Sequence, residues 1–127
     1  MNTKQAIYTK EAPEVLGPYS QAVKVGNMVY LSGQIPLNPV NGEIVTDSID
    51  AATHQIFANL TAVAKASGGS LAQMVKLTIF LTDLGHFPVV NSIMAQYFTE
   101  PYPARSTVQV SALPKGVAIE IEAIMSL

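Results

Sequence analysis

Cysteine and tryptophan are absent from this chain of 127 residues, and arginine occurs once, at position 105. Without cysteine the protein forms no disulfide, no thiolate metal site and no thiol nucleophile. Charged residues make up 13% of the chain, about half of the share typical of globular domains. The lysine and arginine residues are scattered singly and form no basic stripe, so we expect no binding to nucleic acid.

Long apolar runs are missing as well. No stretch approaches the roughly 18 apolar residues that a membrane span needs, and residues 1–9 contain no apolar signal-peptide core. The sequence therefore predicts a cytoplasmic protein that makes no membrane contact. No repeat or linker divides it, which indicates a single domain over residues 1–127.

Apolar residues, in contrast, are abundant at 49%, and the formal net charge is only −2. A domain of this size buries about two thirds of the surface that its unfolded chain exposes. Few charged groups are left to cover the remainder, so the composition predicts a homo-oligomer that hides part of an uncharged surface. The alternative is a monomer with an unusually buried set of apolar side chains.

Strand patterns occur at both ends of the chain and in its middle. Two short β-type runs flank Gly26-Asn27, which is typical of a two-residue hairpin turn. Apolar residues alternate with mostly polar ones from Val75 to Leu81, the period of a strand with one apolar face. The strands predicted from such patterns are residues 22–25, 28–31, 75–81, 106–111 and 117–125, with a further one around 6–9.

Two helices are predicted between these strands. Residues 48–67 have apolar side chains at helical spacing, with Ser48 or Asp50 as the N-cap and Gly68-Gly69 as the stop signal. The second helix runs from Phe87 to about residue 98. The order predicts an α+β fold, a two-layer sandwich in which both helices cover one face of a mixed sheet of five to six strands. We expect its other face to form a subunit interface with polar pockets, and to carry Lys76, Thr78, Arg105, Thr107, Gln109, Glu120 and Glu122.

Arg105 is the first candidate for a functional role. It follows Pro103-Ala104 at the entry to a predicted strand. A planar guanidinium grips a carboxylate or phosphate through two parallel hydrogen bonds, whereas lysine acts as a point charge. The alternative is a structural ion pair with a glutamate.

Glu120 and Glu122 are the candidates for acid–base chemistry. They lie two residues apart in a predicted strand, so both point to the same face. A partly buried carboxylate has a raised pKa and is suited to proton transfer, although a solvated strand face is the alternative. His54 and His86 belong to no metal-ligand motif, and we expect no metal site.

Three further residues sit where small polar ligands are often bound. Tyr19 lies in a Gly-Pro-Tyr-Ser turn, and Ser32 precedes Gly33, which has an accessible backbone amide. The alternative is that all three are ordinary loop residues that bind no ligand. No serine-hydrolase, P-loop or dinucleotide-binding glycine pattern is present.

Six short segments stand in an order and spacing that are specific when taken together. They are Gly17-Pro18-Tyr19-Ser20-Gln21, Gly26-Asn27, Leu31-Ser32-Gly33-Gln34-Ile35-Pro36, Val90-Asn91, Pro103-Ala104-Arg105-Ser106 and Ile119-Glu120-Ile121-Glu122-Ala123-Ile124. Over nearly its whole length the chain resembles the RidA family, also called YjgF or L-PSP. The resemblance implies a chorismate-mutase-like fold and a homotrimer with ligand sites in the clefts between subunits. It also implies an enamine/imine deaminase.

In such an enzyme the substrates are 2-aminoacrylate, 2-iminopropanoate and 2-iminobutanoate. They are reactive products of pyridoxal-phosphate-dependent dehydratases and are hydrolysed to 2-oxo acids and ammonia without a cofactor. By resemblance, Arg105 would hold the substrate carboxylate and Glu120 would orient or activate the attacking water. The residues lining the pocket would be Tyr19, Ser32, Gly33 and Asn91, with Phe87 as an apolar wall or a core residue.

Two departures from the family pattern bear on the predicted site. Thr107 stands where many members have cysteine, and we expect the backbone at this position to preserve its role. The loop through residues 99–102 looks shorter than in several relatives, which would alter the pocket entrance and the substrate preference.

Two other functions remain open at this stage. An endoribonuclease or translation inhibitor would need a basic or stacking surface for RNA, which the acidic composition disfavours. A non-enzymatic regulatory trimer would bind 2-oxo acids in the same clefts. Arg105 fits binding and catalysis alike, whereas a pure binder should tolerate the loss of Glu120.

Overall fold

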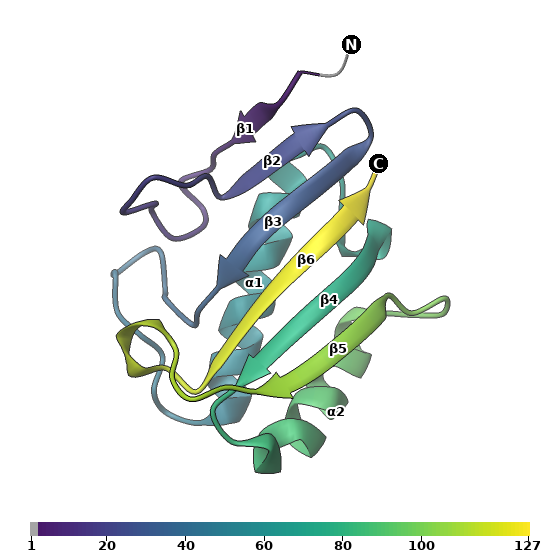
Figure 1. The fold of residues 1–127 in the computed structure, drawn as a ribbon. Helices are drawn as coiled ribbons and strands as arrows, with labels where there is room; N and C mark the ends of the chain where they lie inside the picture. The colour runs from purple at the N-terminus through teal and green to yellow at the C-terminus, as the bar shows by residue number, and fades with distance from the viewer. Residues whose placement is uncertain (1–2) are drawn as a thin grey trace.

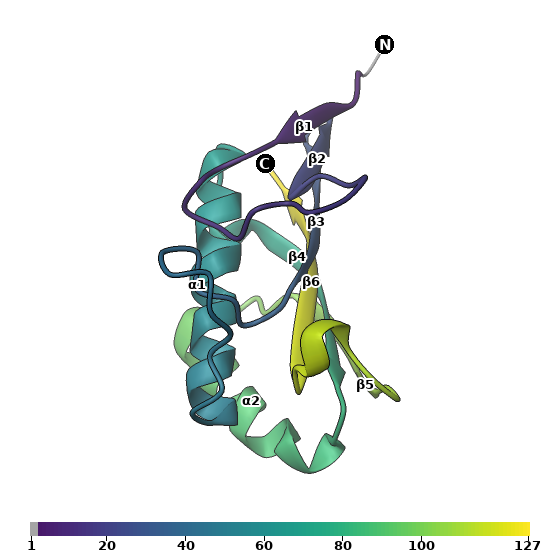
Figure 2. The same ribbon diagram turned by 90° about the vertical axis from the view of Figure 1, so that its left-hand side faces the viewer.

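The computed structural model describes residues 3–127 and has two layers, a six-stranded sheet and a pair of helices that cover one of its faces (Figures 1 and 2). The helices are α1 (Ile49–Ala66) and α2 (Phe87–Tyr97). In sheet order the strands are β1 (Gln5–Ile7), β2 (Ala22–Val25), β3 (Met28–Gln34), β6 (Ile119–Ser126), β4 (Met74–Leu81) and β5 (Ala104–Gln109). Strands β4 and β5 run parallel, and the other four pairings are antiparallel. The predicted α+β fold with a mixed sheet is confirmed.

Helix α1 begins and ends where local chemistry predicts. Ser48 is the N-cap, and its Oγ accepts a hydrogen bond from the Ala51 amide at 3.0 Å. After the C-cap Ser67, Gly68 takes a φ of +92°, a conformation that side chains disfavour. The inner face of α1 is fully buried against the sheet through Ile56, Phe57, Leu60 and Val63.

The alternation predicted for β4 fails at its first residues. Val75 was expected on the buried face, but it is exposed, and Met74 is buried in its place. The pairing with β6 shifts register between Met74 and Lys76. A bulge of this kind inserts one residue and reverses the facing of the residues before it. From Leu77 onward the predicted alternation holds.

The prediction for the open face of the sheet is wrong for three residues of β5. Arg105, Thr107 and Gln109 pair with β4 residues that are fully buried under the helices. Because paired residues in neighbouring strands point to the same side, these three lie on the helix side of the sheet. The strand begins at Ala104, two residues earlier than predicted. The residues that do lie on the open face include Lys76, Thr78, Glu120 and Glu122.

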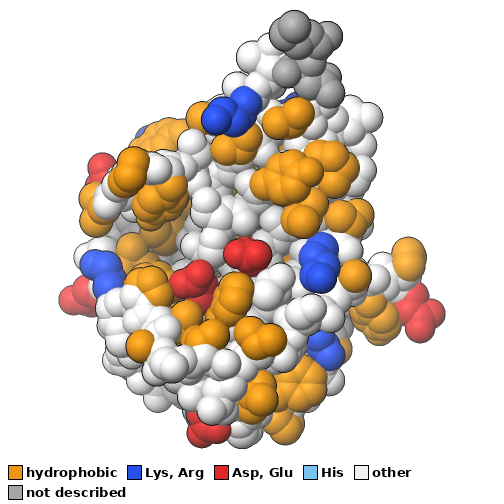
Figure 3. Space-filling model, viewed as in Figure 1, with side chains coloured by type: hydrophobic (Ala, Val, Ile, Leu, Met, Phe, Trp, Pro, Cys, Tyr) orange, Lys and Arg blue, Asp and Glu red, His pale blue; other side chains and the backbone are white. Residues whose placement is uncertain are grey.

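The open face combines apolar and acidic side chains. Figure 3 shows acidic side chains near its centre and hydrophobic side chains on both sides of them. Tyr30 and Val108 are 49% and 41% exposed there. No α-helix within residues 3–127 combines the length and the apolar character needed to cross a membrane.

Candidate functional site

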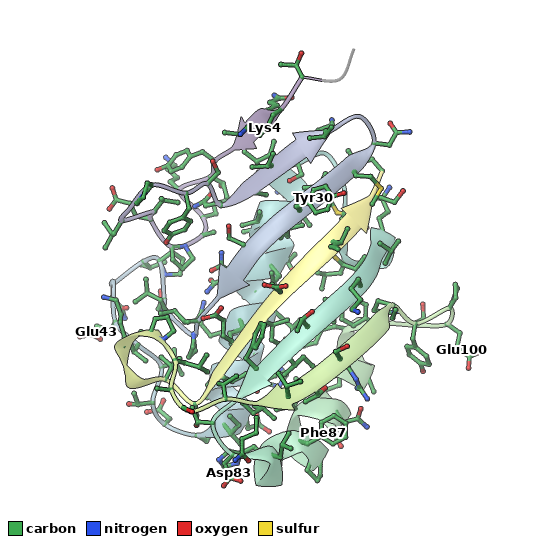
Figure 4. The ribbon with its side chains drawn as sticks, in the orientation of Figure 1. Lys4, Tyr30, Glu43, Asp83, Phe87 and Glu100 are labelled. Atoms are coloured by element: carbon green, nitrogen blue, oxygen red, sulfur yellow. The ribbon has the colours of Figure 1, made fainter. Side chains whose placement is uncertain are left out.

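Arg105 lies at the start of β5, where its side chain reaches helix α2. Its Nη1 donates hydrogen bonds to Asn91 Oδ1 at 2.6 Å and to Met94 Sδ at 3.7 Å. The guanidinium carbon stands 4.9 Å from the centre of the Phe87 ring, a cation–π contact. Figure 4 labels Phe87 at the start of α2, near the β5 edge of the sheet. Positions 87, 91 and 94 share one face of α2 because a helix brings residues three and four apart together.

The charge of Arg105 has no acidic partner in this part of the molecule. Its hydrogen-bond acceptors are an amide oxygen and a thioether, and it forms no ion pair within residues 3–127. The structural ion pair with a glutamate is therefore not observed. Two N–H groups of Nη1 face acceptors on α2, which leaves the N–H groups of Nε and Nη2 for a ligand. Arg105 also lines an open pocket of about 440 Å³, together with Asn91, Met94, Ala95, Tyr102 and Pro103.

Glu120 projects from β6 on the open face and is half-buried. Burial raises the pKa of its carboxyl group, and repulsion from the Glu122 carboxylate raises it further. Glu122 itself is exposed. Glu122 therefore lies on a solvated strand face, while Glu120 is partly withdrawn from solvent.

Gly33 makes room for the Glu120 carboxylate. The residue lies in β3 where the pairing with β6 changes register between Leu31 and Gln34. A Cβ atom at position 33 would stand 2.9 Å from Cδ of Glu120, closer than side chains approach one another. The missing side chain at Gly33 is therefore a condition for the observed position of Glu120.

Tyr19 and Gly33 line a second pocket, of about 210 Å³, together with Gln21, Pro114 and Lys115. Gln21 is 2% exposed, and its Nε2 donates to the Thr9 and Pro13 carbonyls at 2.9 and 3.0 Å. Its Oε1 accepts from the Thr9 amide at 2.7 Å. Gln21 therefore anchors the loop that presents Tyr19.

The hydroxyl groups of Ser32 and Thr107 differ in their hydrogen bonding. The Ser32 hydroxyl donates to the Ser20 carbonyl at 2.6 Å, which ties β3 to the Tyr19 loop. Thr107 shares the helix side of β5 with Arg105. Its Oγ1 is buried and makes no hydrogen bond within residues 3–127.

The structure thus forms two groups from the predicted residues. Phe87 and Asn91 surround Arg105, while Gly33 lies beside Glu120 and lines one pocket with Tyr19. Arg105 and Glu120 lie on opposite faces of the sheet, two strands apart and three residues apart in register. At ordinary strand spacings this separates their Cα atoms by about 14 Å. One small molecule cannot touch both side chains of the same chain.

Two residues of these groups were not predicted. Met94 contacts Arg105 from α2, but a methionine at helical spacing is ordinarily a core residue, and no other sequence signal marks it. Gln21 lies in one of the six family-like segments, but no role was predicted for it. It directly precedes the apolar strand that begins at Ala22, and this position is the sequence signal for its burial.

The model of a protein family described as Endoribonuclease L-PSP matches residues 9–126. The chain belongs to this RidA/L-PSP family. A family relative, the 2-iminobutanoate/2-iminopropanoate deaminase of Dermatophagoides farinae, is 48% identical over 125 residues, 98% of each chain. The resemblance seen in the sequence is confirmed.

Solved structures of family members share the fold over nearly the whole chain. RidA from the Antarctic bacterium Psychrobacter sp. has a TM-score of 0.93 at 48% identity, covering 97% of this chain and 99% of its own. TdcF of E. coli with bound serine has a TM-score of 0.91 at 41% identity, covering 97% and 98%. The names of family members support reactive-intermediate deaminase activity, and the endoribonuclease name occurs in the family as well.

Proposed function

We propose that this protein hydrolyses 2-imino acids and their 2-enamino tautomers, namely 2-iminopropanoate and 2-iminobutanoate, to 2-oxo acids and ammonia. The observation that carries the proposal is the Arg105 guanidinium, held on α2 by neutral groups and open to a pocket with its charge unpaired. Such a group binds the carboxylate that every 2-imino acid has. The deaminase from D. farinae and the serine bound to TdcF, a small amino acid, agree with this ligand class.

In the proposed reaction, Arg105 holds the substrate carboxylate through Nε and Nη2. Glu120 orients a water molecule, accepts its proton as the oxygen bonds to the imine carbon, and returns the proton to the nitrogen. In the resulting carbinolamine the hydroxyl proton passes through Glu120 to the nitrogen as the C–N bond breaks, which releases ammonia and leaves the 2-oxo acid. Protonated imines are already electrophilic, so positioning and proton transfer through one carboxylate suffice. The raised pKa of Glu120 suits it both to accept and to return a proton.

Both residues act on one substrate only if different chains supply them, because they lie on opposite faces of one sheet. The homotrimer with intersubunit sites that the family resemblance implies meets this requirement, and its clefts would pair Arg105 of one subunit with Glu120 of another. The uncovered apolar side chains of the open face support burial in an oligomer.

Mixing two inactive variants tests the assembly of the site. In trimers refolded from equal amounts of Arg105→Ala and Glu120→Gln chains, random assortment places both native residues at about a quarter of the clefts. We expect about a quarter of the wild-type activity to return. A site within one chain would give no recovery at any mixing ratio.

The activity itself is tested in a threonine dehydratase reaction, which releases 2-iminobutanoate. Added protein should accelerate loss of the imine, and Arg105→Ala should remove most of the effect. If the folded wild-type oligomer gives no acceleration but binds 2-oxobutanoate, the regulatory binding function replaces the deaminase. An endoribonuclease is disfavoured because the chain is acidic and its single arginine is held on α2.

Gly33→Ala is expected to lower kcat/KM by about a hundredfold, because the new methyl group displaces the Glu120 carboxylate and small misplacements of a reacting group have effects of this size. The steady-state rate and the melting temperature are measured together. In a Glu120→Gln background the same change should have no further effect on the rate. A full additional loss there would show that Gly33 acts independently of Glu120.

Glu122→Gln is expected to move the acidic limb of the pH–rate profile to lower pH. Glu120 acts as a carboxylate, so activity falls as pH drops through its raised pKa, and removing the Glu122 charge lowers that pKa. The profile is measured after subtracting uncatalysed hydrolysis. Glu43→Gln, an equal charge change at the exposed loop position marked in Figure 4, is the control. An identical shift in the control would assign the effect to net charge.

A further inference from the structure

The orientation of the Arg105 guanidinium is determined by one face of α2. Asn91 and Met94 both accept hydrogen bonds from Nη1, at 2.6 and 3.7 Å, and the Phe87 ring covers one side of the group. With Nη1 so occupied, the edge formed by Nε and Nη2 carries the remaining donors.

An arginine can hold a carboxylate in a bidentate manner along either of two edges. One edge joins Nη1 to Nη2, and the other joins Nε to Nη2. In a 2-imino acid the electrophilic carbon is bonded directly to the carboxylate carbon. A change of edge therefore moves the reacting carbon relative to the attacking water, and only one of the two orientations is productive.

We propose that Met94 is a positioning residue which, with Asn91, blocks the Nη1 edge and restricts the substrate to one orientation. This inference rests on the proposed function and adds a residue to which no role was assigned. Met94 is 5% exposed and lines the 440 Å³ pocket, so its sulfur is fixed beside the guanidinium. A thioether is a weak, uncharged acceptor, so it occupies an N–H group without neutralising the charge that the substrate needs.

Met94→Leu removes the acceptor at nearly constant volume. The freed Nη1 edge then admits a second, non-productive orientation of the substrate. Non-productive binding lowers kcat and KM by the same factor, which we expect to be about three- to tenfold, and leaves kcat/KM unchanged. Met94→Gln, whose amide oxygen accepts the hydrogen bond, should restore both constants. Met125→Leu, at a fully buried methionine of β6, is the matched control and should leave both unchanged.

The single arginine of the chain allows a second measurement that does not depend on activity. In a ¹H–¹⁵N spectrum the Arg105 Nε–H signal is the sole arginine Nε–H resonance, so it needs no assignment. Saturating 2-oxobutanoate, a stable 2-oxo acid, should shift it downfield in the wild type. In Met94→Leu the shift should be smaller, because part of the ligand occupies the other edge.

Several outcomes would overturn the role of Met94. These are wild-type constants in Met94→Leu, a fall in kcat/KM with a raised KM, or equal defects in the leucine and glutamine variants together with lowered melting temperatures. An Nε–H signal that does not respond to 2-oxobutanoate would also overturn this role. Failure of the proposed function gives a different result, because the wild type would then not hydrolyse the imine. In that case the Nε–H signal would still show which edge of Arg105 binds the carboxylate.

Discussion

Arg105→Ala should lower kcat/KM for 2-iminobutanoate by a factor between about thirty and several thousand. Removing one partner of a hydrogen-bonded charge pair costs about 2–5 kcal/mol, and each 1.4 kcal/mol is about tenfold in affinity. The fold should persist, because Arg105 is exposed and its partners are neutral. The measurement combines the rate of imine loss, the affinity for 2-oxobutanoate and the molar mass in solution.

Arg105→Lys is the control for charge alone. Lysine keeps the positive charge but loses the planar pair of donors and the stacking on Phe87. We expect it to recover little of the lost affinity. A near-wild-type rate in Arg105→Ala would remove this residue as the carboxylate anchor, and recovery by lysine would show that a point charge is sufficient.

Glu120→Gln should lower kcat by about a hundredfold to ten-thousandfold, the range for a positioned acid–base group, with little change in KM. Glutamine has nearly the same shape but cannot accept and return a proton. Glu122→Gln, which removes an exposed neighbouring carboxylate, should retain most of kcat at neutral pH and serves as the matched comparison. A Glu120→Gln variant with wild-type kcat would remove Glu120 as the acid–base group.

The stability of Glu120→Gln separates a catalytic from a structural role. The raised pKa of Glu120 means that the folded state favours the protonated carboxyl group. The folded protein therefore loses stability relative to the unfolded chain as pH rises from the ordinary glutamate range through the raised pKa. Glutamine removes this loss, so the variant should melt no lower than the wild type at neutral pH. A lower melting temperature would indicate that the carboxylate has a structural partner.

The fold was predictable where local patterns decide it. The N-cap at Ser48, the hairpin at Gly26 and the alternation from Leu77 onward each follow from a few neighbouring residues. The exposure of Val75 was not predictable from such patterns, because a bulge depends on the pairing between two strands. The facing of Arg105 was missed for a related reason, since a mostly polar edge strand does not reveal which of its faces is inward.

For the candidate site, the sequence supplied residue types but not their grouping. Arg105 and Glu120 stood out by chemistry and by family resemblance; in the structure Arg105 contacts α2, and burial raises the pKa of Glu120. Their position on opposite faces of the sheet follows from strand order and register, which no local pattern encodes. The contact of Met94 with Arg105 was missed because it joins a helix to a strand that follows later in the sequence.

The central position of β6 has a consequence for folding during synthesis. In sequence order this strand follows the other five of the sheet, yet it lies between β3 and β4. Until residues 119–126 leave the ribosome, the nascent chain carries two separate strand groups, each with an unpaired inner edge. Such edges pair readily with other chains. The last strand to be made therefore both closes the sheet and ends the interval in which the new chain is open to aggregation.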